Sequence, residues 1–198
     1  MTSLLEPTTL FEQTMQWLRD QYATFHFYTE RDLVWTVQRH ITDEIERHKL
    51  PYLVFNDYPM LPGAQRSRSA DLVLASEAIN RPKQSQTGKW GISPAVAVAV
   101  AVEFKYEPSH ARIDIWPTKL PVVGWSGILK DIARLHEFIE HQRADAAYAV
   151  FFDESRTFRH RALQLPESWQ DWGQNVAVHW TKVTPSCIPT DQTATPSS

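Results

Sequence analysis

The sequence predicts an α/β fold in which helices flank a mixed central β-sheet. Apolar residues recur every four positions along residues 33–45, which is typical of a helix with one buried face. A continuous apolar run covers residues 95–102, as in a central strand that helices cover on both sides. Shorter strand patterns surround that run. The expected order is therefore helix, three strands, helix and strand, with an extra helix before this core and a further strand after it.

Three helices are expected. The pattern of residues 9–25 predicts the extra N-terminal helix. The second helix should begin after Thr29, because threonine is a favourable N-cap and Asp32 completes an approximate capping box. The third helix is predicted over residues 126–143, with Ser126 as its cap.

Five strands are expected where short apolar runs lie between turn-forming residues. They cover residues 52–58, 69–75, 95–106, 146–152 and 176–180. A helix joins the third strand to the fourth, so we expect these two strands to be parallel and their crossover right-handed.

The composition is that of a folded protein, with 42% hydrophobic and 12% aromatic residues in a chain of 198. We expect residues 1–183 to form a single domain. Residues 184–198, which are rich in Pro, Thr and Ser, are expected to form a disordered tail. The formal net charge of −3 argues against a protein that coats nucleic acid with its whole surface, although a local basic patch remains compatible with it.

The cellular location is predicted from three observations. Cys187 is the only cysteine, which excludes an intramolecular disulfide and a cysteine-rich zinc site and favours a reducing compartment. The first residues lack a basic start followed by an apolar run, so no signal peptide is expected. The longest apolar run is too short to cross a bilayer. We therefore expect a cytoplasmic protein without a membrane partner.

Three charged residues lie at matched places on two neighbouring strands. Asp71 opens the apolar run of its strand, while Glu103 and Lys105 close the most apolar strand. Residues two apart on a strand share a face, so Glu103 and Lys105 should emerge together while Phe104 faces away. A charge at the end of an apolar strand is costly unless it is paired or binds a metal.

The residue types at these positions suggest phosphodiester hydrolysis. Carboxylate oxygens suit Mg²⁺ or Mn²⁺, either of which can acidify a bound water and clamp a phosphate. Lys105 would orient or help to deprotonate that water and offset developing negative charge. The plainer alternative is a solvated Glu–Lys pair at an exposed strand end.

Three segments resemble the motifs of one enzyme superfamily. ERDLV (residues 30–34), ADLV (70–73) and VEFK (102–105) resemble the helix acid, the D motif and the ExK motif of PD-(D/E)XK nucleases. Within that superfamily the pattern is most similar to archaeal Holliday junction resolvases. The helix segment RLHEF (134–138) and the strand segment AVFF (149–152) follow in the same order.

This resemblance covers residues 28–153 and implies a restriction-endonuclease-like αβββαβ core with an extra N-terminal helix. It implies a Mg²⁺- or Mn²⁺-dependent endonuclease that cuts DNA in preference to RNA. Asp71, Glu103 and the Phe104 carbonyl would bind the metal, Glu30 would ligate it or support its shell, and Lys105 would activate water. The chain departs from the pattern at Ala70, where the superfamily's proline would stand, and in the long segment between Asp71 and Glu103.

Four cations flank the motif strands and are candidates for phosphate contacts; the alternative for each is an ordinary solvated cation. They are Arg66, Arg68, Lys119 and Lys130. The expected partner is nucleic acid, and the sequence leaves open a homodimer.

Two rival functions remain. One is a catalytically inactive nucleic-acid-binding or assembly module of the same fold. The other is a zinc enzyme that uses His40, Glu44 and His48, which share one helix flank at four-residue spacing. His136 and His141 are five residues apart, so they point to different sides of a helix and are rejected as a metal pair.

Overall fold

A computed structural model describes residues 5–63, 67–76, 98–115, 122–161, 163, 168–173 and 176–183. Its helices are α1 (Pro7–Gln21), α2 (Glu30–His48) and α3 (Trp125–Glu140), with a short 3₁₀ turn, η1 (Tyr22–Thr24), after α1. Its strands are β1 (Tyr52–Leu61), β2 (Arg68–Ser76), β3 (Val98–Glu107), β4 (Ala144–Asp153), β5 (Gln170–Asp171) and β6 (Ala177–Val183).

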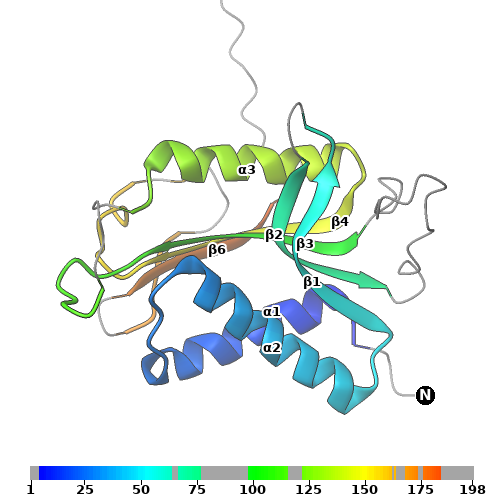
Figure 1. The fold of residues 1–198 in the computed structure, drawn as a ribbon, viewed down its shortest axis with the longest axis horizontal. Coiled ribbons are helices and arrows are strands. Elements are labelled where there is room, and N and C mark those ends of the chain that lie inside the picture. Colours follow the sequence, from blue (N-terminus) through cyan, green and yellow to red (C-terminus); the bar gives the residue numbers. More distant parts are fainter. Residues whose placement is uncertain are drawn as a thin grey trace, which may run out of the picture.

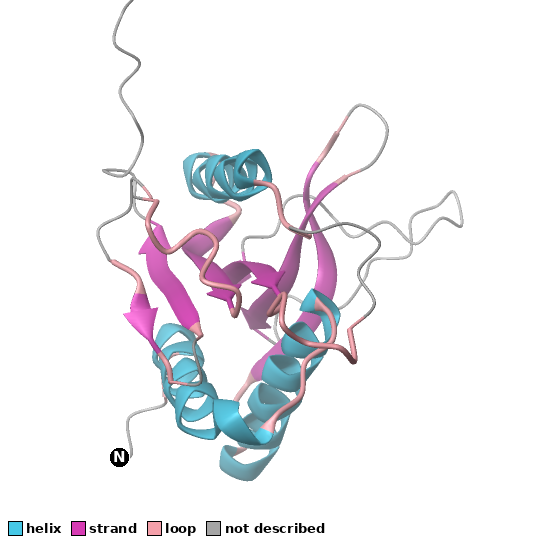
Figure 2. Cartoon of the chain, turned by 90° about the vertical axis from the view of Figure 1, so that its left-hand side faces the viewer, coloured by secondary structure: helices cyan, strands magenta, loops and turns pink. Residues whose placement is uncertain are grey.

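The predicted α/β class with a mixed sheet is confirmed. The six strands form one sheet in the order β1-β2-β3-β4-β6-β5. Only β3 and β4 pair in parallel, as expected for strands joined through α3, and the other neighbours are antiparallel. Helix α3 covers one face of the sheet, and α1 and α2 cover the other (Figures 1 and 2). No helix of the described residues is long and apolar enough to cross a membrane.

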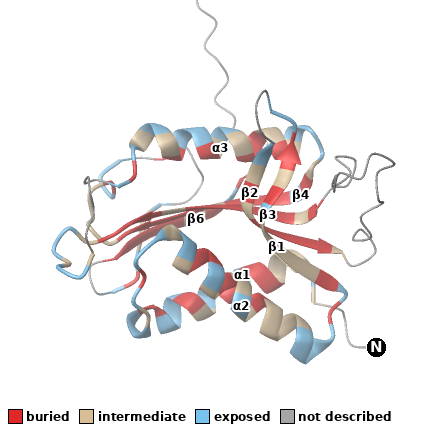
Figure 3. Cartoon of the chain, in the orientation of Figure 1, coloured by how far each residue is buried: buried red, intermediate tan, exposed pale blue. Residues whose placement is uncertain are grey.

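The central strand β3 is buried on both faces, as its apolar sequence predicts (Figure 3). Val100, Val102 and Phe104 belong to the core under α1 and α2. Ala101, on the opposite face, packs in the core beneath α3. The small alanine side chains on that face let α3 approach the sheet closely, which brings polar residues of α3 within reach of β3.

Helix α2 begins where the sequence predicts. The Asp32 carboxylate accepts hydrogen bonds from the amides of Tyr28 and Thr29, at 2.9 and 2.8 Å. The amide groups at a helix start lack partners within the helix, and this carboxylate also complements the positive end of the helix dipole. The cap therefore fixes the first turn of α2, which carries Glu30.

The sheet opens between β2 and β3. These strands pair only from Leu72, opposite Val102, to Leu74, opposite Val100. Beyond that point β1 and β2 bend together out of the plane of the sheet and towards the level of α3 (Figure 1). The next residues along the two strands are Asp71 and Glu103, so the predicted acids lie at the point where the ladder ends.

The ends of the first and third helices differ from expectation, and α3 ends at Glu140 and not at residue 143. The first helix starts earlier, at Pro7, and gives way to the 3₁₀ turn after Gln21; proline at the first helical position loses no hydrogen bond. Ser126 is not the cap of α3, because the helix starts one residue before it and Gly124 is the N-cap. Trp125 is drawn into the first turn, where its ring stacks on Phe158 with centroids 5.9 Å apart.

Candidate active site

Asp71 and Glu103 face each other across the end of the β2–β3 ladder. Extending the register from Leu72 and Val102 by one residue places these acids opposite each other. The Asp71 carboxylate accepts a hydrogen bond of 2.7 Å from the amide of Phe104, where the backbone ladder has stopped. This bond fixes Asp71 against the backbone of β3, beside Glu103.

Glu103 and Lys105 share the α3 face of β3, as their spacing predicts. Glu103 is only 3% exposed, and its Oε1 lies 2.9 Å from Nη1 of Arg134 on α3. Arg134 also contacts Asp131, one helical turn earlier, at 2.8 Å. The buried acid is thus in contact with a cation from the helix above.

Lys105 lies at the centre of an oxygen cluster. Its Nζ is 3.2 Å from Glu30 Oε2 and 2.9 Å from Asp131 Oδ2. It also donates a hydrogen bond of 2.8 Å to the Phe104 carbonyl oxygen. The ammonium group therefore contacts oxygen atoms from α2, β3 and α3, and these oxygens surround its positive charge.

The pKa values of four charged groups in this cluster are raised above their ordinary range. Burial and the Asp71 charge raise the pKa of Glu103 to about 9, although Arg134 acts in the opposite direction. Burial likewise raises the pKa values of Asp71 and Glu30 above their ordinary range. Burial lowers the pKa of Lys105, but Glu30 and Asp131 outweigh this effect, so the net shift is upwards and Nζ keeps its proton.

The first turn of α2 reaches the charged cluster around Lys105. Glu30 contacts Lys105, whereas Asp32 caps the helix. Glu44 lies at the far end and pairs with Arg47 and His48. The proposed zinc flank has different contacts, because His40 stacks on Trp17 with centroids 3.8 Å apart. The structure therefore brings Glu30, Asp71, Glu103 and Lys105 together and keeps Glu44 away from them.

Asp131 and Arg134 belong to the same cluster but were not predicted. They are three residues apart on α3, and so lie on one helical face. Arg134 falls within the segment that resembles the superfamily helix, yet its contact with Glu103 depends on how α3 packs on the sheet. The sequence offered two signals, the spacing of these residues on the predicted helix and the place of Arg134 in that segment.

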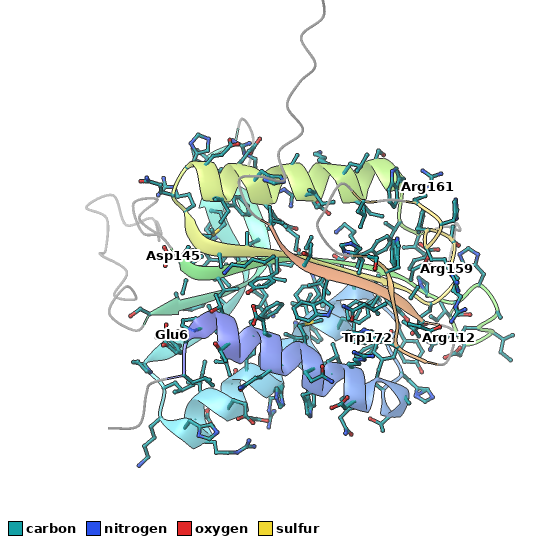
Figure 4. All side chains as sticks on the ribbon, turned by 180° about the vertical axis from the view of Figure 1, so that it is seen from behind. Glu6, Arg112, Asp145, Arg159, Arg161 and Trp172 are labelled. Carbon is teal, nitrogen blue, oxygen red and sulfur yellow. The ribbon has the colours of Figure 1, made fainter. Side chains whose placement is uncertain are left out.

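The four cations that the sequence predicts to contact phosphate lie in different surroundings. Arg68 pairs with Glu137 of α3, and Lys130 is exposed on α3. Arg66 and Lys119 lie outside the described residues, as do the long segment 77–97 and the tail 184–198. Other cations gather at the end of the molecule where β3 and β4 end, and Figure 4 labels three of them: Arg112, Arg159 and Arg161.

The candidate metal ligands named from the sequence are all oxygen atoms, from the carboxylates of Glu30, Asp71 and Glu103 and from the Phe104 carbonyl. The described residues contain no group of three or more His, Cys, Asp or Glu side chains that could hold a metal ion. Small hollows lie on both sides of the cluster. One of about 90 Å³ is lined by Glu30, Asp71 and Trp35 among others, and one of about 20 Å³ is lined by Glu103, Lys105 and Asp131.

Comparison with known proteins gives no match to a family model and no match to a curated protein.

Proposed function

We propose that this protein is a metal-dependent nuclease of the PD-(D/E)XK type, with a restriction-endonuclease-like core, that hydrolyses phosphodiester bonds in DNA. One observation carries the proposal. Two acids from adjacent strands, a lysine two residues after one of them and an acid from the first turn of the preceding helix converge where the sheet opens. The order of elements around them, helix, three strands, helix and strand, supports the same proposal.

The donors at this point suit Mg²⁺ or Mn²⁺. Magnesium is commonly held by one or two carboxylates, with waters and substrate phosphates completing its shell, so a group of three side chains is not required. Asp71 and Glu103 are the carboxylates that would hold the ion, with the Phe104 carbonyl as a third oxygen. A bound ion would polarise the phosphate and acidify a water molecule.

The raised pKa values of Asp71 and Glu103 fit this role. Burial and the neighbouring carboxylates raise the pKa of Glu103 to about 9 against the opposing charges of Arg134 and Lys105, so Glu103 holds a proton at neutral pH that a divalent cation would displace, and the pKa of Asp71 is shifted in the same direction. Metal binding at such a pair releases protons and should therefore strengthen as pH rises.

Lys105 acts as a fixed positive charge. Because its pKa is raised, Nζ stays protonated and cannot take a proton from water. Its charge can instead stabilise the negative oxygens that develop on the phosphate. Asp131 and Glu30 hold the ammonium in place from two sides.

The alternative is a catalytically inactive nucleic-acid-binding or assembly module of the same fold. Its support is that Lys105 and Arg134 already pair with the acids, so the cluster is partly neutralised without a metal ion. A titration with Mn²⁺ discriminates between the two functions, because an active site should bind the ion and lose it in Glu103→Gln.

Cleavage of plasmid and oligonucleotide DNA tests the proposal. The wild type should cut in Mg²⁺ or Mn²⁺ and stop in excess EDTA. Lys105→Ala should lower the rate at least about a hundredfold, a loss of the size seen when a preorganised charge is removed from an active site, with an unchanged circular dichroism spectrum. Lys182→Ala, which removes an exposed lysine on β6, is the control and should cut normally. Undiminished cleavage by Lys105→Ala would refute the assignment of the site.

A further inference from the structure

Two large aromatic side chains, one before Glu30 in the sequence and one after it, are exposed to solvent. Tyr28, just before α2, is 51% exposed, and Trp35, in its second turn, is 56% exposed. Each ring is accompanied by a guanidinium group. Arg31 lies over Trp35 at 5.9 Å from the ring centroid, and Arg112 lies over Tyr28 at 5.2 Å.

These rings border an aromatic cleft of about 630 Å³. Its lining includes the aromatic side chains Trp17, Phe25, Phe27, Tyr28 and Trp35. The acids of the cleft are already engaged. Asp32 accepts backbone hydrogen bonds, and Asp43 pairs with Arg39. The carboxylates therefore do not oppose an anionic ligand as strongly as their number suggests.

Trp35 connects this cleft to the candidate active site. Besides the cleft, Trp35 lines the small hollow that also contains Glu30, Arg31 and Asp71. A chain lying along the cleft would pass over Trp35 and reach the acids directly. Arg31 makes no ion pair with any described carboxylate, so its charge is available to a ligand that passes over Trp35.

We propose that this aromatic surface, formed by Tyr28, Arg31 and Trp35, binds the unpaired bases of a single-stranded segment and leads that strand into the active site. Every nucleobase has a flat face that stacks on an aromatic ring, at about 1–3 kcal/mol per base, and an arginine beside the ring can hold the neighbouring phosphate. A fully paired duplex keeps its bases stacked on one another and cannot use exposed rings in this way. The inference rests on the proposed function, and it narrows the substrate to nucleic acid with a single-stranded region.

Fluorescence anisotropy of labelled oligonucleotides tests this proposal in EDTA, where binding is separated from cleavage. The probes are an oligothymidylate of about 12 nucleotides, within the range that stacking grooves hold, and a blunt duplex of the same length. The wild type should bind the single strand more tightly than the duplex. Trp35→Leu should weaken single-strand binding about tenfold or more, and duplex binding by less than about twofold.

Two variants control the measurement. Trp35→Phe keeps an aromatic face and should stay within about threefold of wild type, because phenylalanine still stacks on a base. Leu129→Ala removes an exposed apolar side chain on α3 and should leave both affinities unchanged. Circular dichroism of each variant reports folding, and a loss shared by both Trp35 variants with an unchanged spectrum would contradict stacking.

The outcomes separate this inference from the proposed function. Cleavage in Mg²⁺ together with unaltered single-strand binding by Trp35→Leu would overturn the inference and leave the nuclease intact. Absence of cleavage together with selective loss of single-strand binding in Trp35→Leu would refute the nuclease and support the surface. No oligonucleotide binding by the wild type, as expected if the rings serve a protein partner, would overturn the inference.

Discussion

Replacing Glu103 by glutamine should stabilise the metal-free protein increasingly as pH rises. The pKa of Glu103 is raised from 4.5 to about 9 in the folded protein, mainly by burial and by Asp71. The folded protein therefore keeps a proton that the unfolded chain has lost above pH 4.5. By linkage, this group makes the wild type less stable as pH rises from 4.5 towards 9, and glutamine, which does not titrate, removes that loss.

The size of the effect follows from the width of this pH window. One pKa unit corresponds to about 1.4 kcal/mol, so a single uncoupled group would contribute about 3 kcal/mol between pH 5.5 and 8.0. Arg134, 2.9 Å from the Glu103 carboxylate, and Asp71 spread the titration over a wider range. We therefore expect the free energy of unfolding of Glu103→Gln, relative to wild type, to rise by about 1–3 kcal/mol over this interval.

Urea denaturation in EDTA at several pH values measures this difference. Glu46→Gln, at an exposed position of α2, controls for the loss of one carboxyl group and should change stability by less than about 0.5 kcal/mol. Added Mn²⁺ should stabilise the wild type and leave Glu103→Gln almost unchanged. A variant that instead loses stability as pH rises would refute the reasoning. It would show that Glu103 is ionised and serves as the structural partner of Arg134.

Three further predictions test other residues. Glu30→Gln should lower the cleavage rate at least about tenfold through loss of its contact with Lys105. Glu44→Gln, at the far end of α2, should cut like wild type. The reverse result would show that the active site lies at the Glu44 end of the helix. Asp71→Asn should be at least as stable as wild type in EDTA, because an amide oxygen can still accept the Phe104 amide hydrogen, and Mn²⁺ should raise the melting temperature of the wild type only. Asp153→Ala should lower the free energy of unfolding, measured by urea denaturation, by about 3 kcal/mol, because this buried carboxylate accepts hydrogen bonds from the amides of Thr157 and Phe158. Asp145→Ala, at an exposed position of the same strand (Figure 4), is the control and should lower it by less than about 0.5 kcal/mol.

Much of the candidate site could be predicted from local pattern. The alternation of a strand sets Glu103 and Lys105 on one face, and β3 has that geometry. The position of Glu30 three residues before Leu33 likewise sets it on the inner side of α2, and the structure places it against Lys105. These relations involve neighbours in the chain, so the period of the element alone determines them.

Asp131, Arg134 and the surface formed by Tyr28, Arg31 and Trp35 could not be predicted in this way. The spacing of Asp131 and Arg134 puts them on one side of α3, but whether that side meets β3 depends on how the helix packs on the sheet. Trp35 lies nearly opposite the buried stripe of α2, so the helical period accounts for its exposure, but its place in one hollow with Asp71 depends on how α2 packs on the sheet.

The sequence by itself determined the order of helices and strands, the cap of α2 and the pairing of Glu103 with Lys105 on one face. Hydrophobic periodicity and capping act over a few residues, so they can be read without the fold. Only the tertiary structure decided that Lys105 is held between Glu30 and Asp131, and that its pKa therefore rises and does not fall. Burial and charge contacts depend on segments distant in the chain, and their balance is set when α2 and α3 pack on opposite faces of the sheet.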